Sequence, residues 1–389
     1  MRILLLTDGI TPFVTGGMQR HSFYLAKFLQ QLGHHITLVH CVPFDKKIPT
    51  NREVIQALDL PQEYSNIEII GFKFPQPGIF PGHYLKESYI YSKLVYEHLS
   101  ESLDKFDFIY AKGFSAWHFL HLKSKGQINR PKIGVNFHGL EMFQPAIGWK
   151  QKFRASLLRG AVKWNLQNAD TVFSYGGKIS SIIKNQGVDE SKIIEIPTGI
   201  ASDKIRSISE SGKHGVRRFV FLGRYERRKG IEELNEVIKQ TVPRDSVSYL
   251  FIGAIPHSKR LKRDDVEYTG ELKDVTEIIS RIDSCDVLIS PSHSEGMPNV
   301  IMEAMARGLG VIATDVGAVS LMVDTDNGWL VKPGDISALK KALTEAADMD
   351  FKSLNDKGVA SLRKVESKYK WELIAQQTAD SLVRAVTNS

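Results

Sequence analysis

Residues 290–308 read SPSHSEGMPNVIMEAMARG, and this stretch decides the fold expected for the second half of the chain. It follows an apolar run that ends near Ser290, and it turns at Gly296. It then enters a helical pattern with Pro298 close to the first turn, where the missing N–H of proline costs nothing. A buried strand that turns directly into a helix is the repeating unit of a parallel sheet covered by helices. The free amides at the start of such a helix attract anionic groups.

The same alternation of apolar runs and helical patterns extends along the rest of the chain. At 389 residues the chain exceeds what one hydrophobic core usually supports, so we expect two domains. Strands are expected at residues 3–6, 36–39, 108–110, 133–137, 172–174 and 193–196, and again at 219–222, 250–252, 287–290 and 311–314. Helices are expected between them at 19–32, 89–102, 179–186 and 231–240. The pattern predicts an α/β protein with two doubly wound parallel sheets, and it assigns a last helix, at about 371–386, to neither of them.

The composition places the chain among ordinary globular proteins, with 42% hydrophobic and 24% charged residues. The apolar run at residues 3–6 is too short for a signal peptide or a membrane span. Cys41 and Cys285 each lie in an apolar stretch and have no disulfide or metal-site spacing. We therefore expect a cytoplasmic protein.

The positive charge is concentrated in the first half of the chain. The net charge is +7, and residues 1–200 carry 23 Lys/Arg against 16 Asp/Glu, whereas residues 201–389 carry 28 against 28. One run without acids, interleaved with apolar residues at roughly helical spacing, holds Lys150, Lys152, Arg154, Arg159 and Lys163. Such a helix either lies on an anionic membrane surface or presents a solvated face over an ordinary core stripe.

Glu295 and Glu303 in the opening stretch are eight residues apart, and they resemble the acid pair of a glycoside hydrolase. On one helix they would be roughly 12 Å apart along the axis, too far to flank one bond, although Glu295 precedes the helix. Carboxylates that accept hydrogen bonds from sugar and ribose hydroxyls explain the spacing better. Two unrelated acids on a surface helix are the alternative.

A second cluster, FVFLGRYERRKG at residues 219–230, is a strand that ends in a glycine turn and is followed by cations. When a nucleoside diphosphate leaves, negative charge develops on its phosphates, and without a metal only fixed cations and amides stabilise that charge. Arg224 and Lys229 are the candidates for this task. We expect Arg227 and Arg228 to be solvated.

Weaker signals follow two strands of the first domain. Gly16 and Gly17 allow the backbone to approach a phosphate or sugar, but they lack the three spaced glycines of a dinucleotide fingerprint. His138 follows an expected strand, which places its imidazole at the crevice beside the carboxyl ends of the strands. Other histidines are expected to be structural, namely His34, His35, His118 and His121.

The triplet Asp324-Thr325-Asp326 matches the metal-binding motif of other sugar transferases. It runs into Asn327-Gly328, a turn signal between two strands, and no further ligand cluster accompanies it. We expect neither a metal site nor any other cofactor.

Together these motifs resemble family 4 of the retaining glycosyltransferases (group 1), which have the GT-B fold of two Rossmann-like domains facing a central crevice. The resemblance covers nearly the whole chain and is most specific from Glu295 to Glu303. It implies an acceptor-side domain at residues 1–198 plus about 372–389 and a nucleotide-sugar domain at 199–371. It also implies that the final helix crosses back to cover the first domain.

The resemblance also implies roles for individual residues. Arg224 and Lys229 would hold the donor diphosphate, Glu303 the ribose and Glu295 the donor sugar, with His138 near the reacting carbon. Residues implied to line the nucleotide sugar are Gly16, Gly17, Gly223, Gly296, Met297, Pro298, Asn299, Val300 and Glu303. In this family the leaving phosphate itself is thought to assist deprotonation of the acceptor, so no protein base is named.

Some positions depart from the family pattern. Gly310 replaces a proline, Thr198 an asparagine, and Ala318 and Ser320 the second glycine and the glutamate of a Gly-Gly-x-x-Glu motif. We therefore weigh a metal-independent transferase of cell-envelope or exopolysaccharide assembly, using a UDP- or GDP-sugar and a glycan or lipid-linked acceptor, against a catalytically silent sugar-nucleotide-binding partner of another glycosyltransferase. An epimerase or phosphorylase on the same fold is a third interpretation. We expect no nucleic-acid partner.

The irregular stretch FKFPQPGIFPGHY at residues 72–84 has prolines that prevent regular structure and aromatic residues that favour burial. It is either a lid that faces the acceptor or a loop packed on its own domain.

Overall fold

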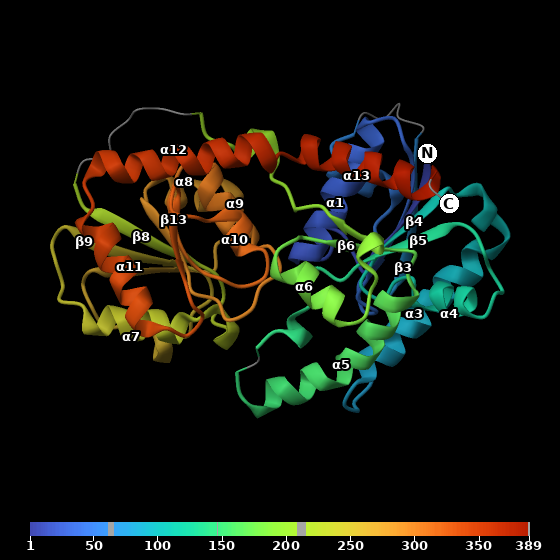
Figure 1. Cartoon of the computed structure of the whole chain (residues 1–389), viewed down its shortest axis with the longest axis horizontal. Helices are drawn as coiled ribbons and strands as arrows, with labels where there is room; N and C mark the ends of the chain where they lie inside the picture. Colours follow the sequence, from blue (N-terminus) through green and yellow to red (C-terminus); the bar gives the residue numbers. More distant parts are fainter. Residues whose placement is uncertain (61–65, 146, 208–214, 388–389) are drawn as a thin grey trace. The chain divides into compact units, whose positions relative to one another are not determined.

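The computed structural model describes residues 1–60, 66–145, 147–207 and 215–387; the side chain of Lys150 lies outside this description. The chain forms two compact units (Figure 1). The first comprises Met1–Phe143, Lys150–Thr198 and Trp371–Ser389, and the second comprises Gln144–Trp149 and Gly199–Lys370. The assignment of Gln144–Trp149 to the second unit has no counterpart in the sequence pattern.

The first unit is built on a seven-stranded parallel sheet in the order β3-β2-β1-β4-β5-β6-β7. Its strands are β1 (Arg2–Leu6), β2 (His35–Val42), β3 (Ile67–Lys73), β4 (Phe108–Lys112), β5 (Lys132–Asn136), β6 (Thr171–Ser174) and β7 (Ile193–Glu195). Its α-helices are α1 (Gly17–Gln31), α2 (Asn51–Ala57), α3 (His83–Leu99), α4 (Trp117–Ser124), α5 (Trp149–Asn168), α6 (Lys178–Asn185) and α13 (Trp371–Thr387). Short 3-10 turns are η1 (Ser100–Lys105), η2 (Glu141–Phe143) and η3 (Glu190–Lys192).

The second unit has a six-stranded parallel sheet in the order β10-β9-β8-β11-β12-β13. Its strands are β8 (Arg217–Leu222), β9 (Val247–Ile252), β10 (Val266–Gly270), β11 (Val287–Ser290), β12 (Gly310–Thr314) and β13 (Gly328–Val331). Its α-helices are α7 (Ile231–Gln240), α8 (Val275–Asp283), α9 (Asn299–Ala306), α10 (Val319–Met322), α11 (Ile336–Asp348) and α12 (Phe351–Lys368). Its 3-10 turns are η4 (Ser202–Lys204), η5 (Arg227–Lys229) and η6 (His257–Lys259).

The predicted α/β class with two parallel sheets is confirmed. The strands given ranges are all present, whereas β3 and β10 were not predicted, and β13 was implied only by the turn signal at Asn327-Gly328. These three strands lie at sheet edges, β3 in the first unit and β10 and β13 at the two edges of the second. Edge strands are covered less completely, so the sequences IEIIGFK, VEYTG and GWLV lack the continuous apolar run that marks a central strand.

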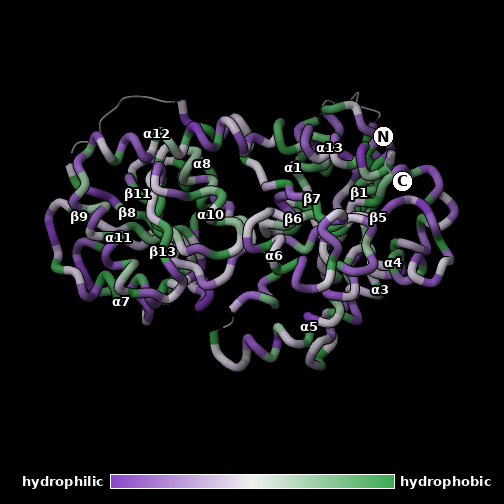
Figure 2. Tube along the Cα trace, in the orientation of Figure 1, coloured by the Kyte–Doolittle hydropathy of each residue, from purple (hydrophilic) through white to green (hydrophobic). Residues whose placement is uncertain are grey.

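Burial on both sheet faces explains the apolar strands of the first unit. Along β1, Leu4 and Leu6 belong to the core cluster that also holds residues of α3, α4, α5 and α6. The alternate residues Ile3 and Leu5 belong to the cluster that holds residues of α1, α2 and α13. Figure 2 shows hydrophobic residues gathered along the strands within each unit.

The last helix, α13, covers the first unit, as the family resemblance implied. Figure 1 shows α13 beside α1, although the whole second unit lies between these helices along the sequence. Trp371 is 1% exposed, and its ring stacks on Tyr24 and Phe28 of α1, with ring centroids 5.5 and 6.3 Å apart. This aromatic stack joins the C-terminal helix to the sheet face that α1 covers.

Replacing Trp371 by Ala is expected to destabilise the first unit by about 3–5 kcal/mol, because it removes a buried aromatic side chain and leaves a cavity. The measurement is urea unfolding followed by circular dichroism. Leu373→Ala is the matched control on the same helix, since Leu373 is 40% exposed. Equal effects of the two substitutions would contradict this role for Trp371.

Candidate functional site

The carboxyl ends of β8 and β11 in the second unit bring together most of the predicted residues. The strand order reverses between these two neighbours, because β9 and β10 lie on one side and β12 and β13 on the other. Connections that leave such a pair in opposite directions open a crevice in which α/β proteins bind ligands. Lys229 follows β8 at the end of η5, and Glu295 follows β11 in the loop that leads to α9.

Glu295 is the centre of a polar network. The residue is 7% exposed. Its Oε1 accepts hydrogen bonds from Lys229 Nζ at 2.6 Å and from Ser292 Oγ at 2.9 Å, and its Oε2 lies 3.5 Å from Arg228 Nη1. Donors that surround both oxygens compensate the lost hydration of the carboxylate.

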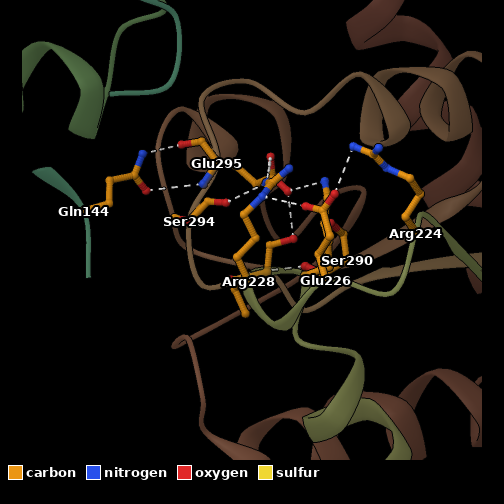
Figure 3. Close-up of polar contacts among 10 residues, drawn as sticks. Gln144, Arg224, Glu226, Arg228, Ser290, Ser294 and Glu295 are labelled. Atoms are coloured by element: carbon orange, nitrogen blue, oxygen red, sulfur yellow. Dashed lines mark hydrogen bonds and ion pairs between the residues drawn. The ribbon is translucent and has the colours of Figure 1, made fainter. Parts of the chain in front are cut away.

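The network continues through Glu226 to Arg224 (Figure 3). Glu226 bridges two arginines, with its Oε1 2.9 Å from Arg224 Nη2 and its Oε2 2.9 Å from Arg228 Nε. The side chain of Arg224 is 75% exposed, whereas that of Lys229 is 17% exposed. Positive and negative groups therefore alternate from Arg224 to Lys229, and the outermost cation faces solvent.

The prediction that Arg227 and Arg228 are solvated is wrong. Arg227 forms a two-pronged pair with Glu233 at 2.7 and 2.6 Å, and hydrogen bonding to that carboxylate raises the pKa of Arg227. Arg228 joins Glu226 to Glu295. The sequence showed four cations in a turn of six residues, but the acids that contact Arg227 and Arg228 include residues of α7 and of the loop after β11.

Two glycines allow the loops of the site to come close together. Gly230 has φ 70°, and a Cβ there would lie 1.8 Å from the Pro291 carbonyl oxygen. Gly317 has φ 55°, and a Cβ there would lie 2.2 Å from the carbonyl oxygen of Glu295. Any side chain at either position would push the loop that carries Lys229 or Glu295 out of place.

The remaining predicted residues of this unit lie in the same loop and helix. Gly296, Met297 and Pro298 are buried, and Pro298 is the N-cap of α9, at the expected start of this helix. Asn299 and Val300 form the half-buried first turn, and Glu303 is half-buried further along α9. Gly223 follows β8, and its N–H donates to the Ile252 carbonyl at 2.9 Å.

Gln144 is a contact that the sequence did not predict. Its amide donates to the Glu295 carbonyl oxygen at 2.6 Å and accepts from the Glu295 N–H at 3.3 Å (Figure 3). Ser292 and Glu226 were not predicted either, although both lie within the two motifs that hold Glu295 and Lys229. No sequence signal connects Gln144 to a residue 151 positions later.

The other predicted residues form a second group in the first unit. Gly16 is the N-cap of α1 and Gly17 its first residue, after β1. His138 follows β5 in a left-handed conformation, φ 58°, with its N–H donating to Asn136 Oδ1 at 2.8 Å. Its Nδ1 bonds to the Tyr175 hydroxyl, while its Nε2 is buried without a hydrogen-bond partner. Burial, followed by the charge of Lys112, lowers the pKa of His138 well below its usual value.

The acidic triplet takes part in ordinary structural contacts. Asp324 pairs with Lys364 at 2.5 Å, and its Oδ1 accepts from the Asp326 N–H at 3.0 Å. Within the described parts of the chain, no three His, Cys, Asp or Glu side chains are grouped so that they could hold a metal ion. The contacts of Asp324 do not resemble a cation site.

Family models match both units. The model described as Glycosyltransferase Family 4 matches residues 15–204, and the model described as Glycosyl transferases group 1 matches residues 216–348. The chain belongs to glycosyltransferase family 4. The residues that carry the resemblance, Gly16, Arg224, Lys229 and the segment 295–303, all lie inside these matches.

One curated relative of this family member is TuaC of Bacillus subtilis (strain 168), named for teichuronic acid biosynthesis. It is 30% identical over 193 residues, which are 47% of this chain and 48% of TuaC. The chain therefore matches about half the length of this relative.

Two solved structures have the same GT-B fold over nearly the whole chain. The sucrose-phosphate synthase of Thermosynechococcus elongatus has a TM-score of 0.77 at 20% identity and covers 100% of both chains. HepE of Anabaena in complex with UDP-glucose has a TM-score of 0.68 at 18% identity and covers 98% of this chain and 99% of HepE.

Replacing Gly317 by Ala is expected to disturb the Glu295 loop. The added Cβ would collide with two backbone carbonyls, so we expect a loss of about 1–3 kcal/mol of stability beyond the cost of the left-handed backbone. Gly270→Ala is the matched control, because Gly270 has φ 77° and a Cβ there would meet no atom within 4 Å. Urea unfolding measures the free energy of unfolding of both variants. If Gly317→Ala loses no more stability than Gly270→Ala, the loops do not need this close approach.

Proposed function

We propose that this family member is a retaining glycosyltransferase that transfers a sugar from a UDP- or GDP-sugar to a glycan or lipid-linked acceptor without a metal. The observation that carries the proposal is the Lys229–Glu295 pair at the point where the strand order of the second sheet reverses. A cation and a carboxylate side by side match the two parts of a nucleotide sugar, its diphosphate and its hydroxyls.

The chemistry assigned to this chain is stabilisation of the leaving group. When the bond between sugar and phosphate breaks, negative charge grows on the diphosphate, and Lys229 and Arg224 offset it. The side chains of the two cations are held differently. Lys229 pairs with the buried Glu295, whereas Arg224 pairs with the more exposed Glu226 and is itself largely in solvent, where it can reach a phosphate. Glu295 accepts hydrogen bonds from the donor sugar, and Glu303 accepts them from the ribose.

For retention of configuration, we propose attack on the same face from which the diphosphate leaves, with a phosphate oxygen taking the proton of the acceptor hydroxyl. The chain then needs to supply positioning and electrostatic stabilisation, and no protein base. In this proposal Gly16, Gly17 and Gly223 let the backbone approach the donor, and His138 contacts the sugar. The name of TuaC and the bound UDP-glucose of HepE support, respectively, a cell-envelope polysaccharide and a nucleotide sugar.

A catalytically silent partner that binds a sugar nucleotide is the second candidate. It is motivated by Ala318 and Ser320, because Ser320 is exposed on α10 where the family pattern has a glutamate. Ala318 still contributes its backbone, since its N–H donates to the Gly296 carbonyl at 2.8 Å. The retained Lys229–Glu295 pair favours the enzyme.

Association with the inner face of an anionic membrane is a further part of the proposal. On α5, Lys152, Arg154 and Lys163 are exposed and have no ion-pair partner among the described residues, and Phe153 beside them is 53% exposed. The proline-rich loop adds apolar surface, because Ile79 is fully exposed and Gly82 lies next to Leu157 of α5. Basic residues around exposed apolar side chains favour an anionic lipid surface. None of the described helices has the length and hydrophobicity needed to cross a bilayer.

The first experiment is thermal unfolding with UDP, GDP, ADP and their sugars, in the presence of a chelator. A ligand that binds the native state raises the melting temperature, so one nucleotide sugar is expected to raise it more than the others.

Lys229→Ala and Arg224→Ala are each expected to slow transfer on the order of a hundredfold or more. Arg244→Ala is the control, because Arg244 pairs with the exposed Asp348 at the surface of the same unit.

Three outcomes separate the candidates. A rise in melting temperature together with sugar transfer supports the transferase. A rise in melting temperature without sugar transfer supports the silent partner. If no nucleotide shifts the melt and Lys229→Ala leaves turnover unchanged, the assignment of this site is wrong.

Removing the basic residues of α5 is expected to weaken binding to vesicles that contain anionic lipid. The described cations to be changed together to Gln are Lys152, Arg154, Arg159 and Lys163. At about 1 kcal/mol per cation, the loss of affinity is expected to exceed a hundredfold and to shrink at high salt. A variant with the same charge change in the second unit is the control, with Gln at Lys332, Lys341, Lys352 and Lys368. Equal weakening in both variants would contradict a specific membrane surface on α5.

A further inference from the structure

Lys112, the last residue of β4, is buried in a way that is unusual for a lysine. It is 0% exposed, and its Nζ lies 2.8 Å from His21 Nδ1, in hydrogen-bonding distance. Nζ also lies over the face of the Tyr110 ring, 4.6 Å from the ring centroid. No carboxylate in the described part of the chain lies within ion-pair distance of this ammonium. Burial of a cation without a paired anion opposes folding, so a buried lysine of this kind suggests a role in function.

The position of Lys112 points to a ligand site. In the first sheet the strand order reverses between β1 and β4, because β2 and β3 lie on one side and β5 to β7 on the other. Lys112 ends β4 at this reversal, and His21 comes from the helix that follows β1. The crevice at such a reversal is where this class of sheet binds ligands.

A chain of contacts leads from Lys112 to His138. As an ammonium, Lys112 has N–H groups only to donate, so in that state His21 Nδ1 accepts and the proton of the neutral His21 ring is on Nε2. The His21 ring is 5% exposed and meets the His138 ring edge to face, with centroids 5.2 Å apart and planes at 90°. The Trp371 ring centroid lies 5.0 Å from that of His21, so His21 has little room to turn.

The charges around His138 favour its neutral form. Burial and then the charge of Lys112 lower the pKa of both His21 and His138 well below the usual value. Burial also raises the pKa of Tyr175, so its hydroxyl keeps its proton and donates to His138 Nδ1. Asp8 interacts electrostatically with Lys112. Burial raises the pKa of Asp8 to about 6, and its Oδ1 is buried without a hydrogen-bond partner.

We propose that Lys112 is a positioning residue, which acts through His21 to hold the neutral His138 ring in one orientation and one tautomer, with Nε2–H directed at a sugar hydroxyl. The orphaned Nε2 is the atom left over when Tyr175 occupies Nδ1. The proposal rests on the proposed function, because it takes the ligand of His138 to be a sugar. It assigns Lys112 no contact with substrate.

Lys112→Met tests the proposal, because methionine is unbranched, apolar and of similar length. Removal of an unpaired buried cation is expected to leave the melting temperature unchanged or raise it. The same substitution is expected to slow transfer about tenfold to a hundredfold, because the His138 ring is no longer held in place. Opposite effects on stability and turnover are what a purely structural lysine would not produce.

The ¹⁵N ring signals of His138, assigned with a His138→Gln variant, report its tautomer without substrate. The wild-type protein is expected to show a single tautomer protonated at Nε2, and Lys112→Met a mixture. His21→Phe keeps a ring in the same place but removes the acceptor of Lys112, so it is expected to give the same mixture. The double variant Lys112→Met/His21→Phe is expected to slow transfer no more than either single variant, because both substitutions break the same chain of contacts.

Arg217→Met is the matched control, because Arg217 is a buried cation of the second unit, 4% exposed, with an unpartnered Nε. It is expected to leave turnover and the His138 signals unchanged. Wild-type turnover and an unchanged single tautomer in both Lys112→Met and His21→Phe would overturn the proposal. If the wild-type protein binds no nucleotide sugar, the proposed function fails, while the His138 signals still decide whether Lys112 positions this ring.

Discussion

The reversal of strand order in each parallel sheet is the constraint on which the candidate sites depend. At β8 and β11, and again at β1 and β4, successive connections leave in opposite directions, so the loops cannot cover the carboxyl ends of both strands. Polar side chains that follow these strands therefore gather at the carboxyl ends of the two strands. Lys229 and Glu295 meet in this way in the second unit, and Lys112 and His21 meet in the first.

Buried charges are compensated differently around Glu295 and around Lys112. Around Glu295, three cations and two acids alternate, so each charge has an opposite neighbour within the protein. In the proposed function, the cations of this network are the groups that contact the diphosphate. Arg224 is the least constrained of them, because its side chain is mostly in solvent.

Around Lys112 the charge is not balanced by a close anion. Asp8 is the acid that acts on Lys112 electrostatically, and it raises the pKa of the lysine while burial lowers it by more. The resulting environment keeps the neighbouring histidines uncharged, in contrast to the ionic network of the second unit. An uncharged imidazole offers a hydrogen bond to a hydroxyl without attracting phosphate, which fits a group assigned to sugar rather than to diphosphate.

The sequence by itself determined the fold class, the family and the two motifs of the second-unit site, because continuous apolar strands, helical spacing and a motif of nineteen residues are local properties of the chain. Arg224, Lys229, Glu295 and Glu303 were predicted from such local patterns. Only the tertiary structure paired Arg227 with Glu233 and joined Gln144 to Glu295, because no periodic pattern in the sequence marks these pairs. The return of α13 to α1 was implied by the family resemblance, and the structure shows the aromatic contacts that hold it there. Lys112 is the clearest case of a residue whose surroundings the sequence does not predict. A lysine after an apolar run indicates only the end of a strand. Its burial follows from the packing of α1, which brings His21 against it from 91 positions earlier in the chain.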